Sequence, residues 1–77
     1  MTKQELCNEI ADIMEVDAEI NETTDLTQFE EFDSLAIMSL VAMINSKFGK
    51  RIPGTQLKAI KTPAELIALI GTDAFEV

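Results

Sequence analysis

Apolar side chains near the start of the chain recur at three- and four-residue intervals, which is the spacing of one face of an α-helix. Leu6, Ile10 and Met14 mark this face. Residues 2–5 read Thr-Lys-Gln-Glu and have the Thr-x-x-Glu form of a capping box, which is typical of a helix start. The pattern predicts a first helix from about residue 3 to Glu15.

The most apolar segment of the chain, residues 35–48, predicts a second helix. Asp33 and Ser34 precede this segment as candidate N-caps, because their side chains can accept hydrogen bonds from the free N–H groups of a helix start. Gly49 follows it, and glycine commonly ends a helix.

Two shorter helices are predicted in the rest of the chain. Residues 50–54 contain Ile-Pro and form an extended connector, since the residue before a proline is pushed away from helical angles. Residues 55–60 can then form one or two turns of a minor helix. Residues 62–65 read Thr-Pro-Ala-Glu, a second capping box with proline at the first helical position, and predict a last helix that ends at Gly71.

The segment between the first two helices, residues 16–33, lacks helical periodicity and is rich in threonine and acidic residues. Its apolar anchors are Ile20, Leu26, Phe29 and Phe32. Loops of more than about 12–15 residues without secondary structure are uncommon in compact domains and tend to be functional. We predict a long ordered loop that can contain a helical turn.

These elements predict an all-α fold. We expect a small four-helix bundle of three main helices and one short helix, with the long loop between helices one and two. Hydrophobic residues make up 47% of the chain and aromatic residues 5%, a profile that favours helices over a sheet. No repeat or linker divides the chain, so one domain is expected over residues 1–77, with residues 72–77 as a frayed tail.

The composition narrows the classes of function. The chain has no histidine, the commonest general base and metal ligand, so we expect neither catalytic residues nor a metal site. The net charge of −8 argues against nucleic acid and anionic membranes as partners. No apolar run is long enough for a membrane span, and a cytoplasmic protein is expected. Cys7, the single cysteine, stands among apolar residues and is expected to be a buried thiol.

The acidic loop contains an incomplete calcium-binding pattern. Asp17, Glu19 and Asn21 stand at its first, third and fifth positions. However, Glu22 replaces the glycine needed at the sixth position, and Gln28 replaces the glutamate needed at the twelfth. A weak calcium-binding module therefore remains only an alternative, and a solvated acidic rim is expected here.

The segment Asp33-Ser34-Leu35 is the most informative part of the sequence. By itself it needs no explanation beyond helix capping. Its surroundings are an amphipathic helix, a long acidic loop, an apolar helix ending in Phe-Gly, an Ile-Pro connector and a threonine-capped last helix. This arrangement, over roughly residues 6–71, resembles the acyl carrier proteins.

The resemblance implies that Ser34 receives a 4′-phosphopantetheine arm from coenzyme A. A magnesium-dependent phosphopantetheinyl transferase, the holo-acyl-carrier-protein synthase, would attach it, with Asp33 helping to position the metal and Leu35 anchoring the helix start. The arm would carry acyl groups as thioesters, so the chain would be a covalent cosubstrate and not an enzyme. The partners implied are acyl-activating enzymes, ketosynthases or acyltransferases of fatty-acid, polyketide or related specialised biosynthesis.

The sequence departs from the family in two respects. Glu31 and Phe32 stand where many members have glycine followed by a small residue. In addition, fatty-acid carriers usually display several acids on the second helix, whereas residues 35–48 contain none. Residues 1–33 hold eleven acids and one base, for a net charge of −10, and residues 34–77 hold three acids and five bases, for a net charge of +2.

We therefore expect partner enzymes to recognise both the acidic loop and an apolar strip on the second helix. Glu30 and Glu31 would steer basic partners toward Ser34. Met38 and Val41 belong to a helix surface that is more apolar than one core-facing stripe requires. The alternative is that the apolar anchors of the loop fold over this strip and hide it.

The function expected from the sequence is that of a free-standing, monomeric acyl carrier in a specialised pathway. Two other functions stay open. One is a peptidyl or aminoacyl carrier, and the other is an unmodified helical adaptor in which Ser34 is only a cap.

Overall fold

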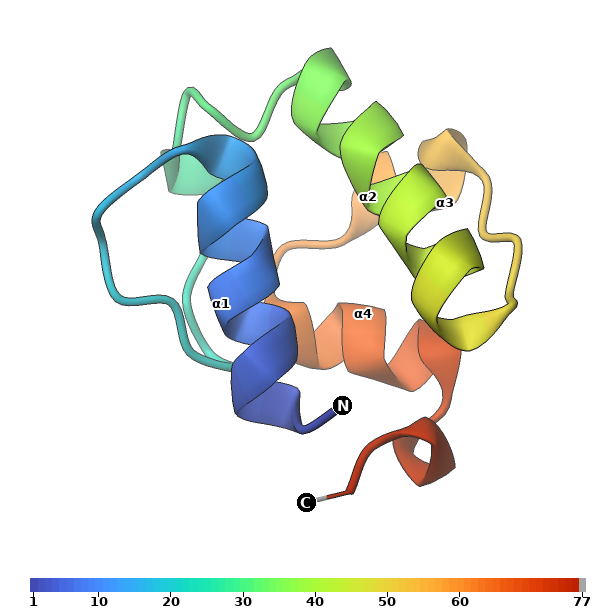
Figure 1. The fold of residues 1–77 in the computed structure, drawn as a ribbon. Coiled ribbons are helices and arrows are strands. Elements are labelled where there is room, and N and C mark those ends of the chain that lie inside the picture. Colours follow the sequence, from blue (N-terminus) through green and yellow to red (C-terminus); the bar gives the residue numbers. More distant parts are fainter. Residues whose placement is uncertain (77) are drawn as a thin grey trace.

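The computed structural model describes residues 1–76 and consists of helices joined by loops (Figure 1). The four α-helices are α1 (Lys3–Met14), α2 (Ser34–Phe48), α3 (Gly54–Ala59) and α4 (Pro63–Ile70). Two short 3₁₀ turns are η1 (Leu26–Gln28) and η2 (Thr72–Ala74). Residues 1–76 contain no β-strand, so the predicted all-α four-helix bundle is confirmed.

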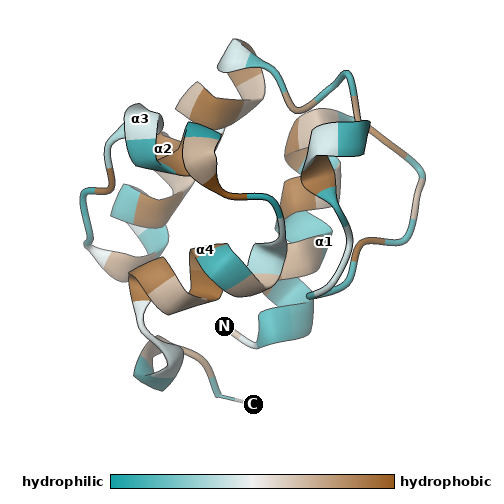
Figure 2. Cartoon of the chain, turned by 180° about the vertical axis from the view of Figure 1, so that it is seen from behind, coloured by the Kyte–Doolittle hydropathy of each residue, from teal (hydrophilic) through white to brown (hydrophobic). Residues whose placement is uncertain are grey.

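The helices pack around one core. α2 contacts both α1 and α3, while α4 packs against α1 (Figure 1). The long loop runs along the outer side of α1, the side away from α2 (Figures 1 and 2). The start of the chain lies beside its last described residues, where the Met1 ammonium is 3.3 Å from Oε1 of Glu76. The backbone N–H of Glu76 also donates to the carbonyl of Met1.

Both predicted capping boxes form. The Thr2 hydroxyl accepts from the N–H of Glu5 at 3.1 Å, and Glu5 accepts from the N–H of Thr2 at 2.8 Å. Thr62 and Glu65 make the same pair of bonds at the start of α4. Hydrogen bonds from backbone N–H groups lower the pKa of both glutamates: Thr2 is the main donor to Glu5, and Lys61 and Thr62 donate to Glu65.

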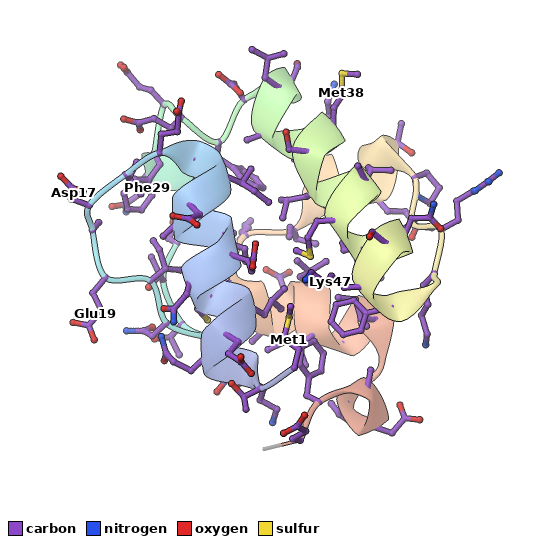
Figure 3. The ribbon with its side chains drawn as sticks, in the orientation of Figure 1. Met1, Asp17, Glu19, Phe29, Met38 and Lys47 are labelled. Atoms are coloured by element: carbon purple, nitrogen blue, oxygen red, sulfur yellow. The ribbon has the colours of Figure 1, made fainter. Side chains whose placement is uncertain are left out.

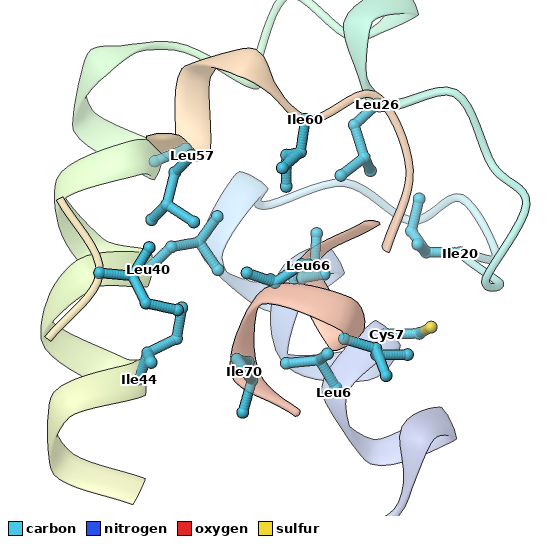
Figure 4. Close-up of a cluster of buried hydrophobic side chains, with 14 of the residues drawn as sticks. Leu6, Cys7, Ile20, Leu26, Leu40, Ile44, Leu57, Ile60, Leu66 and Ile70 are labelled. Carbon is cyan, nitrogen blue, oxygen red and sulfur yellow. The ribbon is translucent and has the colours of Figure 1, made fainter. Parts of the chain in front are cut away.

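The core is filled by aliphatic side chains from all four α-helices and from the loop (Figure 4). Hydrophobic and hydrophilic residues alternate along α1, whereas α4 is hydrophobic over most of its length (Figure 2). The fully buried side chains are Leu6, Cys7, Ile10, Leu26, Leu40, Ile44, Leu57, Pro63, Leu66 and Ile70. Cys7 is thus the buried thiol that the sequence predicts, and burial raises its pKa.

The predicted long loop is ordered and is fastened to the other end of the chain. The N–H of Leu26 donates to the carbonyl of Lys61 at 2.7 Å, and the N–H of Ala64 donates to the carbonyl of Glu22 at 3.1 Å. Ile20 and Leu26 are both buried, and η1 supplies the helical turn considered for this segment. The loop is therefore part of the packed core.

The C-terminal segment differs from the expected frayed tail. Residues 72–74 form η2, and the next residue, Phe75, is only 8% exposed. Its ring packs against Phe48 at the end of α2, with the ring centroids 5.2 Å apart. The burial of an aromatic ring outweighs the loss of chain entropy that would otherwise favour fraying. Val77, the last residue of the expected tail, lies outside the described residues.

Replacing a buried loop residue tests whether the loop stabilises the fold. Leu26→Ala should lower the free energy of unfolding by about 2–5 kcal/mol, because it leaves a cavity among helix side chains. Gln28→Ala, an exposed position in the same turn, should change it by less than about 0.5 kcal/mol. Urea unfolding followed by circular dichroism measures both, and equal midpoints for the two variants would contradict the packing of the loop.

Salt should stabilise the fold, because the acids of the first half have few partners. The only ion pair in residues 1–76 is the one between Met1 and Glu76. Sodium chloride should raise the melting temperature by about 4–8 °C for each kcal/mol of repulsion that it screens. Magnesium and calcium should act more strongly at equal ionic strength without saturating at one equivalent. A melting temperature that is insensitive to all three salts would show that the carboxylates do not repel one another.

Candidate functional site

The start of α2 is set by Asp33, which is the N-cap of the helix. Its Oδ1 accepts from the N–H of Ala36 at 3.0 Å, and its carbonyl accepts from the N–H of Ile37 at 2.9 Å. Helix α2 therefore begins at Ser34, one residue before the predicted start. Of the two candidate caps, the aspartate fills the role because its carboxylate reaches the free amide of the first turn.

Ser34 consequently stands exposed at the first position of a fifteen-residue helix, with its hydroxyl released from capping. The N–H groups of Ser34 and Leu35 belong to the first turn and have no acceptor within the helix. Together with the helix dipole, they make this end of α2 favourable for an anionic group.

A depression of about 320 Å³ adjoins the serine. Its lining residues come from the loop, α2 and α3, and are Thr27, Phe32, Asp33, Ser34, Ile37 and Lys58. Lys58 therefore brings a cation to the surface beside Ser34. Local sequence patterns do not mark Lys58, since only the packing of α3 against α2 brings a residue so distant in sequence near the serine.

Two large apolar side chains at the start of α2 are open to solvent. Leu35 is 75% exposed and Met38 is 68% exposed, and Figure 3 shows Met38 projecting outward from the helix. Phe29 and Phe32 of the loop pack against the core without covering them. The alternative in which the loop hides this surface is therefore wrong. Val41, the other predicted contact residue, is only partly exposed and packs against the core.

A wider groove of about 730 Å³ lies between the end of α1 and the first half of α2. Its α2 wall includes Leu35, Met38 and Ala42, and its α1 wall comprises residues 12–15. Glu31 and Asp33 also line it, whereas Glu30 is exposed outside it. The structure thus places Glu31, Leu35 and Met38 on one surface and leaves Glu30 and Val41 away from it.

The acids of the loop do not converge on a metal site. No group of three acidic or cysteine side chains within residues 1–76 is arranged to hold a metal ion. Asn21, a ligand position in the calcium pattern, instead uses its side-chain oxygen to accept from the N–H of Thr23 at 2.9 Å and from the hydroxyl of Thr24 at 3.1 Å. Among the described helices, none is both long and apolar enough to cross a membrane.

Comparison with known families gives a match over most of the chain. Residues 4–70 match the family described as the phosphopantetheine attachment site. This range includes all of α1 except Lys3, the whole of α2, α3 and α4, and the depression beside Ser34. Comparisons with curated proteins and with solved structures give no match.

Glutamate substitutions on α2 should separate its solvent-facing and core-facing positions. Met38→Glu should change the free energy of unfolding by less than about 0.5 kcal/mol, because the residue is already exposed. Val41→Glu should lower it by about 1–3 kcal/mol, because the charge would be placed partly within the core. Thermal unfolding measures both, and a stable Val41→Glu variant would contradict the orientation of α2.

Proposed function

The chain belongs to the phosphopantetheine attachment-site family, and on that basis we propose that Ser34 is the residue that bears the arm. Members of this family are non-catalytic carriers that hold 4′-phosphopantetheine covalently, so the protein is a carrier and not an enzyme. They work with a phosphopantetheinyl transferase and with biosynthetic enzymes. The observation that carries the assignment to Ser34 is its free, exposed hydroxyl at the start of α2, next to a capping aspartate.

The residues around Ser34 fit a phosphodiester. The first-turn N–H groups of α2 favour an anion at this position, and Lys58, which lines the adjoining depression, would supply a counter-charge. The serine would supply the oxygen: its hydroxyl gives up the proton and bonds to the phosphorus of the arm, while the adenosine bisphosphate part of coenzyme A leaves. The arm itself supplies a terminal thiol for thioester formation.

Asp33 has two roles in this proposal. One carboxylate oxygen fixes the start of α2 by accepting from the N–H of Ala36. The carboxylate would also help to position the magnesium ion that the transferase uses to bind coenzyme A. Leu35 does not anchor the helix start as the resemblance implies, because its side chain is 75% exposed and lies outside the core. It is instead available to a partner enzyme.

We propose further that the cargo is an acyl group of fatty-acid, polyketide or related specialised biosynthesis, carried by a cytoplasmic monomer with one domain over residues 1–77. The contact between Met1 and Glu76 supports a single compact unit. The absence of acids from residues 34–48 supports a specialised pathway, because partner enzymes would meet an apolar helix surface instead of an acidic one.

The assignment of Ser34 can be tested by loading. Incubation with coenzyme A, magnesium and a phosphopantetheinyl transferase should add the mass of one arm to the wild-type chain. Ser34→Ala should abolish this gain and change the free energy of unfolding by less than about 0.5 kcal/mol, because the cap is provided by Asp33. Ser46→Ala, an exposed serine near the end of the same helix and outside both depressions, should load normally and serves as the control.

Loading of Ser34→Ala at the wild-type level would overturn the assignment, and a wild-type chain that never loads would favour the unmodified adaptor. The cargo is read separately, from the mass of the arm-bearing peptide isolated from native cells. An aminoacyl or peptidyl group on this peptide would replace the acyl-carrier proposal with the peptidyl one.

A further inference from the structure

Two acids at the end of α1 occupy positions that do not favour helix stability. Asp12 lies in the last turn of α1, Glu15 is its C-cap, and the last turn contains no basic residue. The C-terminal end of a helix carries partial negative charge, so carboxylates there are unfavourable. Both residues are exposed, and both line the groove between α1 and α2.

Glu15 also has an unfavourable backbone conformation. Its φ of 59° is in the left-handed region, and it is the one non-glycine residue in residues 1–76 with a positive φ. Glycine is the usual residue at such a helix end, because a side chain makes this conformation less stable. The stability of α1 does not account for a glutamate at this position. The negative charge that it adds to the groove does.

The groove combines these acids with exposed apolar side chains. Glu31 and Asp33 complete an acidic rim, and Leu35 and Met38 form the apolar wall on α2. Among the described residues, no lysine or arginine lines the groove. This pattern is complementary to a protein surface on which an apolar side chain is flanked by lysine or arginine.

We propose that the groove between α1 and α2 is the docking site for the phosphopantetheinyl transferase, and that Asp12 and Glu15 supply the electrostatic contacts that α2 lacks. The proposal rests on the proposed function, because it assigns a surface to the enzyme that would modify Ser34. The groove would be complementary to a basic transferase surface with an apolar residue at its centre.

The negative charge of the groove favours the transferase over two other occupants, a second copy of the chain and the phosphopantetheine arm. A second copy of the chain would set one acidic rim against another, which is repulsive. The arm is also disfavoured, since its phosphodiester is anionic, and the cation beside Ser34 is Lys58 in the other depression. The groove is therefore free for a basic partner while the arm lies on the opposite side of the α2 start.

The test compares two double variants that remove the same charge. Asp12→Asn with Glu15→Gln neutralises the α1 side of the groove. Asp17→Asn with Glu19→Gln is the control, because both acids are exposed on the loop, away from α2 (Figure 3). The readouts are kcat/KM for loading by a transferase that modifies the wild-type chain, at low and high salt, and the melting temperature.

The groove variant should lose roughly 3- to 10-fold in kcat/KM at low salt, mainly through KM, and the difference should shrink at high salt. Its melting temperature should rise by about 2–8 °C, because two charges that oppose the helix dipole are removed. Weaker docking by a more stable protein cannot be attributed to unfolding. The control should keep kcat/KM within about twofold of the wild-type value.

Equal kcat/KM values for the two variants would overturn the proposal while leaving Ser34 loading intact, whereas a wild-type chain that does not load would refute the proposed function itself.

Amide chemical shifts give a second test with an inactive transferase. Changes at residues 12–15 and 35–42 are expected. Transferase-induced changes confined to the depression of Lys58 would contradict transferase docking in the groove. Shifts in the groove that arise from arm attachment or self-association alone would also contradict it.

Discussion

The burial of Leu26 is the packing constraint on which the arrangement of the candidate site depends. Its side chain is fully buried, and its N–H bonds to the carbonyl of Lys61, just before α4. This double attachment holds the loop against the core seven residues before Asp33. The loop can then deliver Asp33 to the start of α2 in the extended conformation that an N-cap requires. The exposure of Ser34 follows from this placement.

Helix stability and the proposed recognition place opposite demands on the charges of this chain. Hydrogen bonds to backbone N–H groups stabilise the carboxylates of Glu5 and Glu65, where acids favour a helix start. Asp12 and Glu15 stand at the opposite end of α1, where the dipole disfavours them. Marginally stable domains can retain such residues when function requires them, because only a small part of the total stability is lost.

The surface around the start of α2 is divided by charge. Acids of α1 and the loop line the groove on one side, and Lys58 of α3 lines the depression on the other. An apolar α2 separates the two regions and exposes Leu35 and Met38 between them. A partner enzyme therefore meets an oriented surface, although the second helix carries no acid of its own.

The sequence by itself determined the helices, their caps and the family, because these depend on local spacing. Thr2 and Thr62 with their partner glutamates predict helix starts, and Asp33-Ser34-Leu35 is the segment from which the modification at Ser34 is proposed. Only the tertiary structure decided which surfaces face one another. The tertiary structure separated exposed Met38 from half-buried Val41 and packed Phe75 on Phe48. It also placed Lys58 in the depression beside Ser34 and Asp12 in the groove on the α1 side of α2. These outcomes depend on contacts between residues far apart in the chain, which local periodicity does not encode.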